Sequence, residues 1–229
     1  ISSTKGTPGS GRGTTFGRVR SRVSDRPESF GEFPVTAMLE EIETPGDGQI
    51  RAMITVAGNP VSSNPNAARV DAAFASLDFM VAVDPYINET TRHADVILPP
   101  PSALQKSHYD LALLNFAVRN VANYSPALLP LDSDDAGDRV NEWEILLRLA
   151  AIVSGLGADA DIGPLDDVVA ATVAGGDTDR LEAVAHRRGP ERVLDLMLRN
   201  GPYPELSLEV LEANPHGVDL GALQPDRIP

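Results

Sequence analysis

Three short apolar runs, separated by helical patterns, constrain the fold of this chain more than any other feature. They are IRAMITVA (50–57), FMVAV (79–83) and VIL (96–98), the last followed by three prolines. A continuous apolar run of about five residues is typical of a strand buried on both faces of a parallel sheet. Between the first two runs, Val70, Phe74 and Leu77 share one helical face. The alternation predicts an α/β fold with an open, mostly parallel sheet and flanking helices.

The remaining segments predict three regions along the chain. Residues 1–33 are rich in Gly, Ser and Arg without a period and predict an irregular lead-in or linker. We expect residues 34–155 to form the α/β nucleotide-binding domain, and residues 156–229 to form a helical extension with an extended tail. The stretch 111–118 fits either a strand or a helix. Helical patterns cover residues 34–43, 141–154, 164–173, 178–187, 190–199 and 205–212.

Composition excludes several kinds of function. The chain has no cysteine, so it can form no disulfide or thiolate metal site and can supply no iron–sulfur ligand. Its formal net charge is −14, which argues against nucleic acid or an anionic membrane as the main partner. No apolar stretch approaches the roughly 20 residues of a membrane span. Ile1-Ser2-Ser3-Thr4 lacks an initiator Met and a signal pattern, so we expect an internal piece of a longer, cytoplasmic chain.

Polar residues follow the first two predicted strands. Gly58 would let a backbone approach a ligand, and Asn59 offers an amide donor and acceptor. We expect Asn64 to cap a helix whose first amides, including that of Ser63, would face an anion. Asp84 follows the second strand and could accept hydrogen bonds from ribose hydroxyls or a base edge. Because ordinary turns use the same residue types, the spacing alone favours a nucleotide site and a plain turn equally.

Other motifs in the sequence are better explained by turns and helix ends than by a binding or catalytic site. Gly155-Leu156-Gly157-Ala158-Asp159-Ala160 fits a dinucleotide fingerprint but follows a helix, so we interpret it as a helix stop. Asp132, Asp134 and Asp135 lack calcium-loop spacing. The four histidines show no ligand spacing, and we interpret His93 and His216 as local hydrogen-bonding residues. A sugar-nucleotide enzyme would need an acid–base pair, and the sequence offers no convergent one.

Gly58-Asn59-Pro60, Asp84 and ETTRHADVILPP (89–100) together resemble the molybdopterin oxidoreductases. These are the bis-molybdopterin-guanine-dinucleotide enzymes related to formate dehydrogenase, nitrate reductase and dimethyl sulfoxide reductase. The family pattern has a Gly-x-Asn-Pro-like turn, a strand ending in Asp, a Thr-Glu-Thr-like turn and Ala-Asp-Val-Val-Leu-Pro. The ordered similarity covers about residues 50–106. After Lys106 the chain departs from the family's Gly-rich stretch.

The resemblance implies a fragment of a larger oxidoreductase that is catalytically silent on its own. The parent would carry molybdopterin guanine dinucleotide with molybdenum or tungsten, and an iron–sulfur cluster outside this chain is possible. The implied partners are the parent's remaining domains and a redox subunit. Position in the motif implies these cofactor contacts, beside the backbone approach expected at Gly58: Asn59 at the nucleotide, Val83 and Asp84 at the guanosine, and Lys106 at the cofactor's polar end. Asn141 or its neighbour Glu142 stands where many family members have a cofactor-binding Asp.

Two hypotheses therefore stand at this stage. In the first, the chain binds one guanine-dinucleotide arm of the cofactor, and the metal ligand lies elsewhere in the parent. In the second, the chain is a non-catalytic nucleotide-fold module kept for domain or subunit contacts. The Gly- and Pro-punctuated helices after residue 160 suit a segment that wraps a neighbour.

Overall fold

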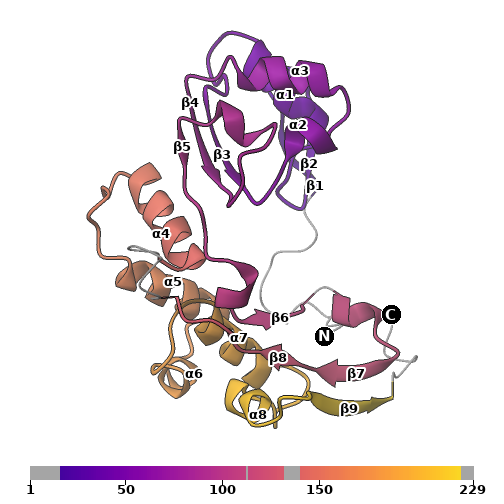
Figure 1. Cartoon of the computed structure of the whole chain (residues 1–229), viewed down its shortest axis with the longest axis vertical. Coiled ribbons are helices and arrows are strands. Elements are labelled where there is room, and N and C mark those ends of the chain that lie inside the picture. Colours follow the sequence, from indigo (N-terminus) through magenta and orange to yellow (C-terminus); the bar gives the residue numbers. More distant parts are fainter. Residues whose placement is uncertain (1–15, 112, 132–139, 223–229) are drawn as a thin grey trace. The chain divides into compact units, whose positions relative to one another are not determined.

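The computed structural model describes residues 16–111, 113–131 and 140–222 (Figure 1). The chain divides into two compact units, one reaching to Pro100 and one beginning at Pro101. This division by compactness does not test the limits expected for the nucleotide-binding region, which stay a prediction. The lead-in 1–15 and the acidic residues Asp132, Asp134 and Asp135 lie outside the described residues.

A three-stranded parallel sheet forms the centre of the first unit. Its strands β3 (Ala52–Val56), β4 (Phe79–Val83) and β5 (Val96–Ile97) lie in the order β3-β4-β5. Ala52 pairs with Phe79, and Val81 pairs with Val96. Helices α2 (Pro60–Ser63) and α3 (Ala67–Phe74) connect β3 to β4, and the 3-10 turn η1 (Thr91–His93) connects β4 to β5. The predicted α/β fold with a parallel sheet is confirmed.

Apolar side chains of the helices and the sheet form the core of this unit. Helix α1 (Val35–Glu43) and helix α3 lie side by side (Figure 1). The buried cluster consists of Leu39, Ile42, Val61, Val70, Ala73, Phe74 and Met80. On the other face of the sheet, Ile54, Val56, Phe79 and Val96 are exposed, whereas Val81 and Val83 of the middle strand are buried. One face of the sheet is therefore apolar and partly open.

The segment 16–34 is more ordered than its composition predicts. Strands β1 (Phe16–Arg20) and β2 (Pro27–Ser29) pair antiparallel. The Arg18 backbone N–H donates to Glu28 at 2.8 Å, and the Arg22 side chain donates to Glu41 of α1 at 3.1 Å. The expectation of irregular structure was wrong here because side-chain contacts, not apolar periodicity, hold this ribbon together.

The helix after β3 begins in a different place from the one expected. Helix α2 already starts at Pro60 and ends at Ser63, and α3 starts three residues after Asn64. The Ser63 N–H donates to the Asn59 carbonyl at 2.9 Å, and the Asn64 N–H donates to the Pro60 carbonyl at 3.0 Å. These two amides are engaged inside the turn, so the prediction of an anion at a helix start formed by them was wrong. Asn66, with φ of 63°, precedes α3 instead.

The second unit combines helices with two short antiparallel ribbons. Its helices are α4 (Glu142–Val153), α5 (Gly163–Ala174), α6 (Thr178–Ala183), α7 (Gly189–Arg199) and α8 (Leu208–Glu212). The ribbons pair β6 (His108–Tyr109) with β8 (Tyr124–Ser125), and β7 (Arg119–Ala122) with β9 (Val218–Ala222). Two 3-10 turns, η2 (Ala103–Gln105) and η3 (Leu113–Phe116), complete it.

These elements resolve two of the open sequence interpretations. Within the ambiguous stretch 111–118, the residues that the structure describes form the 3-10 turn η3 and neither a longer helix nor a strand. Gly155 follows α4 with φ of 82°, the left-handed conformation of a glycine helix stop, as predicted. No helix of the described residues is long and apolar enough to cross a membrane.

Candidate functional site

The loops that leave β3 and β4 lie at the carboxyl edge of the parallel sheet, where ligands bind in open α/β folds. Ala57 follows β3 with φ of 49°, and its N–H donates to the carbonyl of Val83 at 3.0 Å. A left-handed conformation is unusual for a residue with a side chain. It turns the chain sharply at the strand end and directs Gly58 and Asn59 into the loop.

The side chain of Asn59 joins the loops after β3 and β4. Its Oδ1 accepts a hydrogen bond from the Thr90 hydroxyl at 2.7 Å, and its Nδ2 donates to Glu89 at 2.8 Å. The Thr90 hydroxyl also accepts from the Val61 N–H at 3.0 Å. The hydrogen bond from Asn59 lowers the pKa of Glu89. The two loops therefore form one connected group.

Asp84 lies directly after β4 and is only 8% exposed. Its Oδ1 accepts from the Tyr86 N–H at 2.8 Å, and its Oδ2 lies 3.4 Å from the Asn88 amide nitrogen. Each carboxylate oxygen can accept two hydrogen bonds, so this carboxylate keeps acceptor capacity. Val83, the preceding residue, is fully buried and ends the strand.

The rest of the β4–β5 loop is closed by its own side chains. Asn88 Oδ1 accepts from the backbone N–H groups of Thr90 and Thr91 at 2.9 and 3.0 Å. The Thr91 hydroxyl donates to the Tyr86 carbonyl at 2.9 Å. His93 Nε2 lies 2.6 Å from Asp71 of α3, which confirms it as a local hydrogen-bonding residue. This closed loop fixes the position of Glu89 and Thr90 opposite Asn59.

Gly58 and Ser63 differ in what surrounds them. A Cβ built on Gly58 would meet the Val56 carbonyl at 3.6 Å and the Pro60 ring at 3.9 Å, which are ordinary contacts. Nothing within the described chain therefore requires glycine there. Ser63 is exposed at the end of α2, and its place in a cofactor site stays a prediction.

Lys106 and Asn141 belong to the second unit. The Lys106 ammonium lies 2.7 Å from Glu142 Oε2, with both side chains half-buried. Asn141 precedes α4, where its backbone N–H and its Nδ2 donate to Glu144 at 2.7 and 3.1 Å. Lys106 and the Asn141–Glu142 pair, which are 35 residues apart in sequence, thus come together in this unit.

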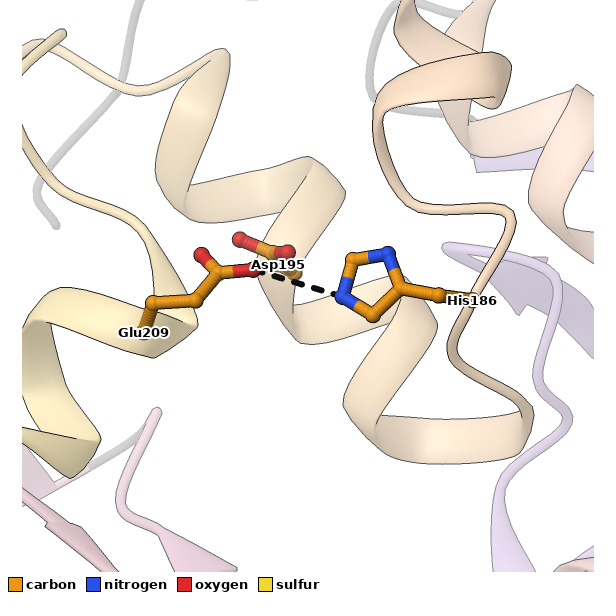
Figure 2. A group of neighbouring side chains, drawn as sticks. All are labelled: His186, Asp195 and Glu209. Atoms are coloured by element: carbon orange, nitrogen blue, oxygen red, sulfur yellow. Dashed lines mark ion pairs between the residues drawn. The ribbon is translucent and has the colours of Figure 1, made fainter.

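Sequence spacing showed no metal-ligand pattern, yet the fold assembles one group of candidate ligands. His186, Asp195 and Glu209 each offer an atom within 4.8 Å of the others (Figure 2). His186 lies before α7, Asp195 on α7 and Glu209 on α8. His186 Nε2 is 3.3 Å from Glu209 Oε1.

Two guanidinium groups already neutralise these carboxylates. Arg199 donates to Asp195 at 2.9 Å and to Glu209 at 2.6 Å. Arg187 lies 3.6 Å from both Asp195 and Glu209. A divalent cation would have to displace or repel these positive groups. We therefore interpret the group as an ion-pair network that attaches α8 to α7.

Comparison with known proteins places the strand-end loops in a known family. Residues 5–108 match the family model described as molybdopterin oxidoreductase. The assimilatory nitrate reductase catalytic subunit of Bacillus subtilis (strain 168) is 33% identical over 114 residues, which are 50% of this chain and 14% of that protein. The F420-dependent formate dehydrogenase 1 subunit alpha of Methanococcus maripaludis is 28% identical over 102 residues, 44% of this chain and 14% of that protein.

The resemblance inferred from sequence is confirmed: about half of this chain is similar to molybdopterin oxidoreductases. The family implies a pterin cofactor that carries molybdenum or tungsten. The chain spans about a seventh of the length of these two relatives. The site residues Gly58, Asn59, Val83 and Asp84 lie within the matched segment.

Proposed function

We propose that this chain binds one guanine-dinucleotide arm of the molybdenum or tungsten cofactor of a molybdopterin-dependent oxidoreductase. One observation carries the proposal. The nearly buried carboxylate of Asp84 lies at the carboxyl end of the middle strand and keeps acceptor capacity. Guanine has an exocyclic amino group that donates hydrogen bonds, and ribose has hydroxyl donors. A carboxylate at this position suits both.

The residues around Asp84 fit the guanosine end of such a group better than its phosphates. Glu89 is also a carboxylate, and through Asn59 it belongs to the same loop edge. Two negative side chains would repel phosphate oxygens but accept hydrogen bonds from a base or a sugar. A side chain at Gly58 would make only ordinary contacts, so packing within the described chain does not explain the glycine. Close approach of a ligand to the backbone would explain it.

In this proposal the cofactor supplies the redox chemistry, and the chain supplies binding and orientation. Asp84 would hold the base or ribose, with the backbone of Val83 beside it. Asn59 keeps one amide N–H and one oxygen lone pair for the ligand after its contacts with Glu89 and Thr90. Lys106 and Asn141 are proposed contacts by position in the family motif. Lys106 would act with its charge partly neutralised by Glu142.

The parent protein would contribute what this chain lacks. We propose that its remaining domains, and a redox subunit, are the partners of this chain. An iron–sulfur cluster would lie in those domains, because this chain has no cysteine.

Calorimetry with GDP tests the proposal. We expect the wild-type chain to bind GDP more tightly than ADP. Guanine presents two adjacent donors to a carboxylate, N1–H and the 2-amino group, whereas adenine has an acceptor at N1 beside its single amino group. Asp84→Asn keeps the oxygen that accepts from Tyr86 but loses the negative charge, so we expect binding about 10-fold weaker. Asp78→Asn is the matched control, because Asp78 lies before the amino end of the same strand. Equal GDP affinity of wild type and Asp84→Asn would contradict the role of Asp84.

A second candidate function rests on the open face of the sheet. Ile54, Val56, Phe79 and Val96 are exposed apolar residues on alternate strand positions, whereas parallel sheets are normally covered on both faces. A nucleotide-fold module kept for domain or subunit contacts would have such a face. Absence of GDP binding, together with concentration-dependent association that Ile54→Lys abolishes, would favour this module.

A further inference from the structure

A fully buried hydroxyl, that of Thr90, lies between the two strand-end loops. It accepts a hydrogen bond from the Val61 N–H at 3.0 Å and contacts Asn59 Oδ1 at 2.7 Å. A backbone N–H can only donate, and a hydroxyl has a single proton. The Thr90 hydroxyl donates its proton to Asn59 Oδ1, and this orientation of the carboxamide agrees with Nδ2 facing Glu89, whose carboxylate can only accept.

This direction decides which way the Asn59 carboxamide points. With Oδ1 held by Thr90, Nδ2 faces Glu89 Oε2 at 2.8 Å and donates to it. The same hydrogen bond lowers the pKa of Glu89. The second N–H of Asn59 and the carboxylate of Glu89 then form a neighbouring donor and acceptor.

We propose that Thr90 is a positioning residue of the nucleotide site: its buried hydroxyl sets the orientation of Asn59, and through Asn59 that of Glu89. The inference rests on the proposed function for its binding role. A ligand meets Asn59 with its carboxamide already oriented, so no orientational freedom is lost when it binds. Without the Thr90 hydroxyl, the Asn59 carboxamide keeps only its hydrogen bond to Glu89 and regains rotational freedom about that contact.

Thr91 provides a matched control for Thr90. It is also fully buried. Its hydroxyl also accepts one backbone N–H, that of Asn88 at 2.8 Å, and donates once, to the Tyr86 carbonyl at 2.9 Å. Thr90→Val and Thr91→Val therefore remove the same kind of group from the same loop, but only the first contacts Asn59. Thr90→Ser restores the hydroxyl.

Two measurements on the full chain test the proposal, with circular dichroism and urea unfolding confirming that each variant is folded at the working temperature. In GDP calorimetry, we expect Thr90→Val to bind about 10-fold more weakly, Thr91→Val to lose clearly less affinity than Thr90→Val, and Thr90→Ser to stay within about twofold of wild type. In ¹⁵N–¹H spectra, the Asn59 side-chain amide should respond to acid titration of Glu89 in wild type and Thr90→Ser. We expect Thr90→Val to weaken this response, because the carboxamide is then held by Glu89 alone.

The outcomes separate the inference from the proposed function. Equal weakening by Thr90→Val and Thr91→Val would overturn the positioning role, as would an unchanged Asn59 response in Thr90→Val. If the wild type binds no GDP, the proposed function and the binding role of Thr90 both fail. The spectra then still decide whether Thr90 orients Asn59.

Discussion

The carboxylate of Asp95 accepts a hydrogen bond from the backbone N–H of Met80 at 2.7 Å. The Asp95 N–H in turn donates to the Met80 carbonyl at 2.9 Å. Asp95 precedes β5, and Met80 lies within β4. The Ala-Asp-Val run that identifies the family thus has a structural role here, because its Asp joins the third strand to the second.

Removing this carboxylate should destabilise the sheet. We expect Asp95→Ala to lower the free energy of unfolding by about 1.5 kcal/mol, because a hydrogen bond to a charged acceptor is lost from a partly exposed position. Urea unfolding measures this change. Asp78→Ala is the control, since Asp78 forms an exposed ion pair with Arg51 and should cost less than about 0.5 kcal/mol. Equal effects of the two substitutions would contradict the role of Asp95.

Gly189 should not tolerate a side chain. It has φ of 58°, and a Cβ there would lie 2.6 Å from Cε2 of Trp143. We expect Gly189→Ala to cost about 3 kcal/mol by overpacking and backbone strain, and to shift the fluorescence of the single tryptophan. Gly175→Ala is the matched control, because Gly175 has φ of 68° but no atom within 4 Å of an added Cβ. Gly175→Ala should lower the free energy of unfolding by about 1 kcal/mol.

Asp166 and Asp167 are adjacent in sequence, but we expect them to contribute very differently to the stability of the fold. Asp166 is buried and accepts from the Gly189 N–H at 3.0 Å and from buried Arg192 at 3.3 Å. We expect Asp166→Ala to lower the free energy of unfolding by about 3 kcal/mol, because it removes the acceptor of the buried Gly189 N–H and one of the two carboxylates that pair with Arg192. Exposed Asp167 contacts Arg192 and Arg188 at 2.6 and 2.8 Å, and Asp167→Ala should cost less than about 1 kcal/mol. Thermal unfolding of both variants would refute this ranking if their midpoints coincide.

Acid should weaken the attachment of α8 to α7. Burial opposes the shift, but the hydrogen bonds of Glu209 and the charges of Arg199 and Arg187 lower its pKa to about 2 from 4.5. A pKa lowered by folding contributes stability that is present above the unfolded value and is lost as pH falls through the folded one. The loss should therefore extend from about pH 4.5 to about pH 2.

Glu209→Gln tests this pH dependence. The variant lacks the titrating carboxylate, so between pH 5 and pH 3 its free energy of unfolding should fall less than that of the wild type. Urea unfolding at several pH values measures the difference between the two curves. If the two curves of unfolding free energy against pH are parallel, Glu209 does not contribute to the pH dependence of stability.

Regular apolar patterns predicted the elements most accurately. The run FMVAV is β4 at the same limits, 79–83, and the amphipathic pattern 141–154 is α4, Glu142–Val153. These elements bury a continuous or periodic apolar surface, which is a local property of the sequence. The β1–β2 ribbon was missed because its stability comes from polar contacts such as that between Arg22 and Glu41.

The candidate site was predicted in outline but not in its contacts. Residue order indicated that Asn59 and Asp84 follow neighbouring strands. Thr90 was quoted within the family motif but not identified as a site residue, since its partner Asn59 lies 31 residues earlier in the chain. The sequence signal for this residue was the turn Glu89-Thr90-Thr91, which places two hydroxyls beside a carboxylate. Only the folded loops show that its first threonine is the one that contacts Asn59.

The amino-acid sequence alone was sufficient for the family segment, the parallel sheet and the position of the strand-end loops. Those features depend on apolar runs and turn residues that act over a few neighbouring positions. The tertiary structure decided which polar atoms meet: Thr90 with Asn59, Lys106 with Glu142, and His186 with Glu209. Such contacts join residues far apart in sequence, and their geometry exists only after the apolar core has brought the elements together.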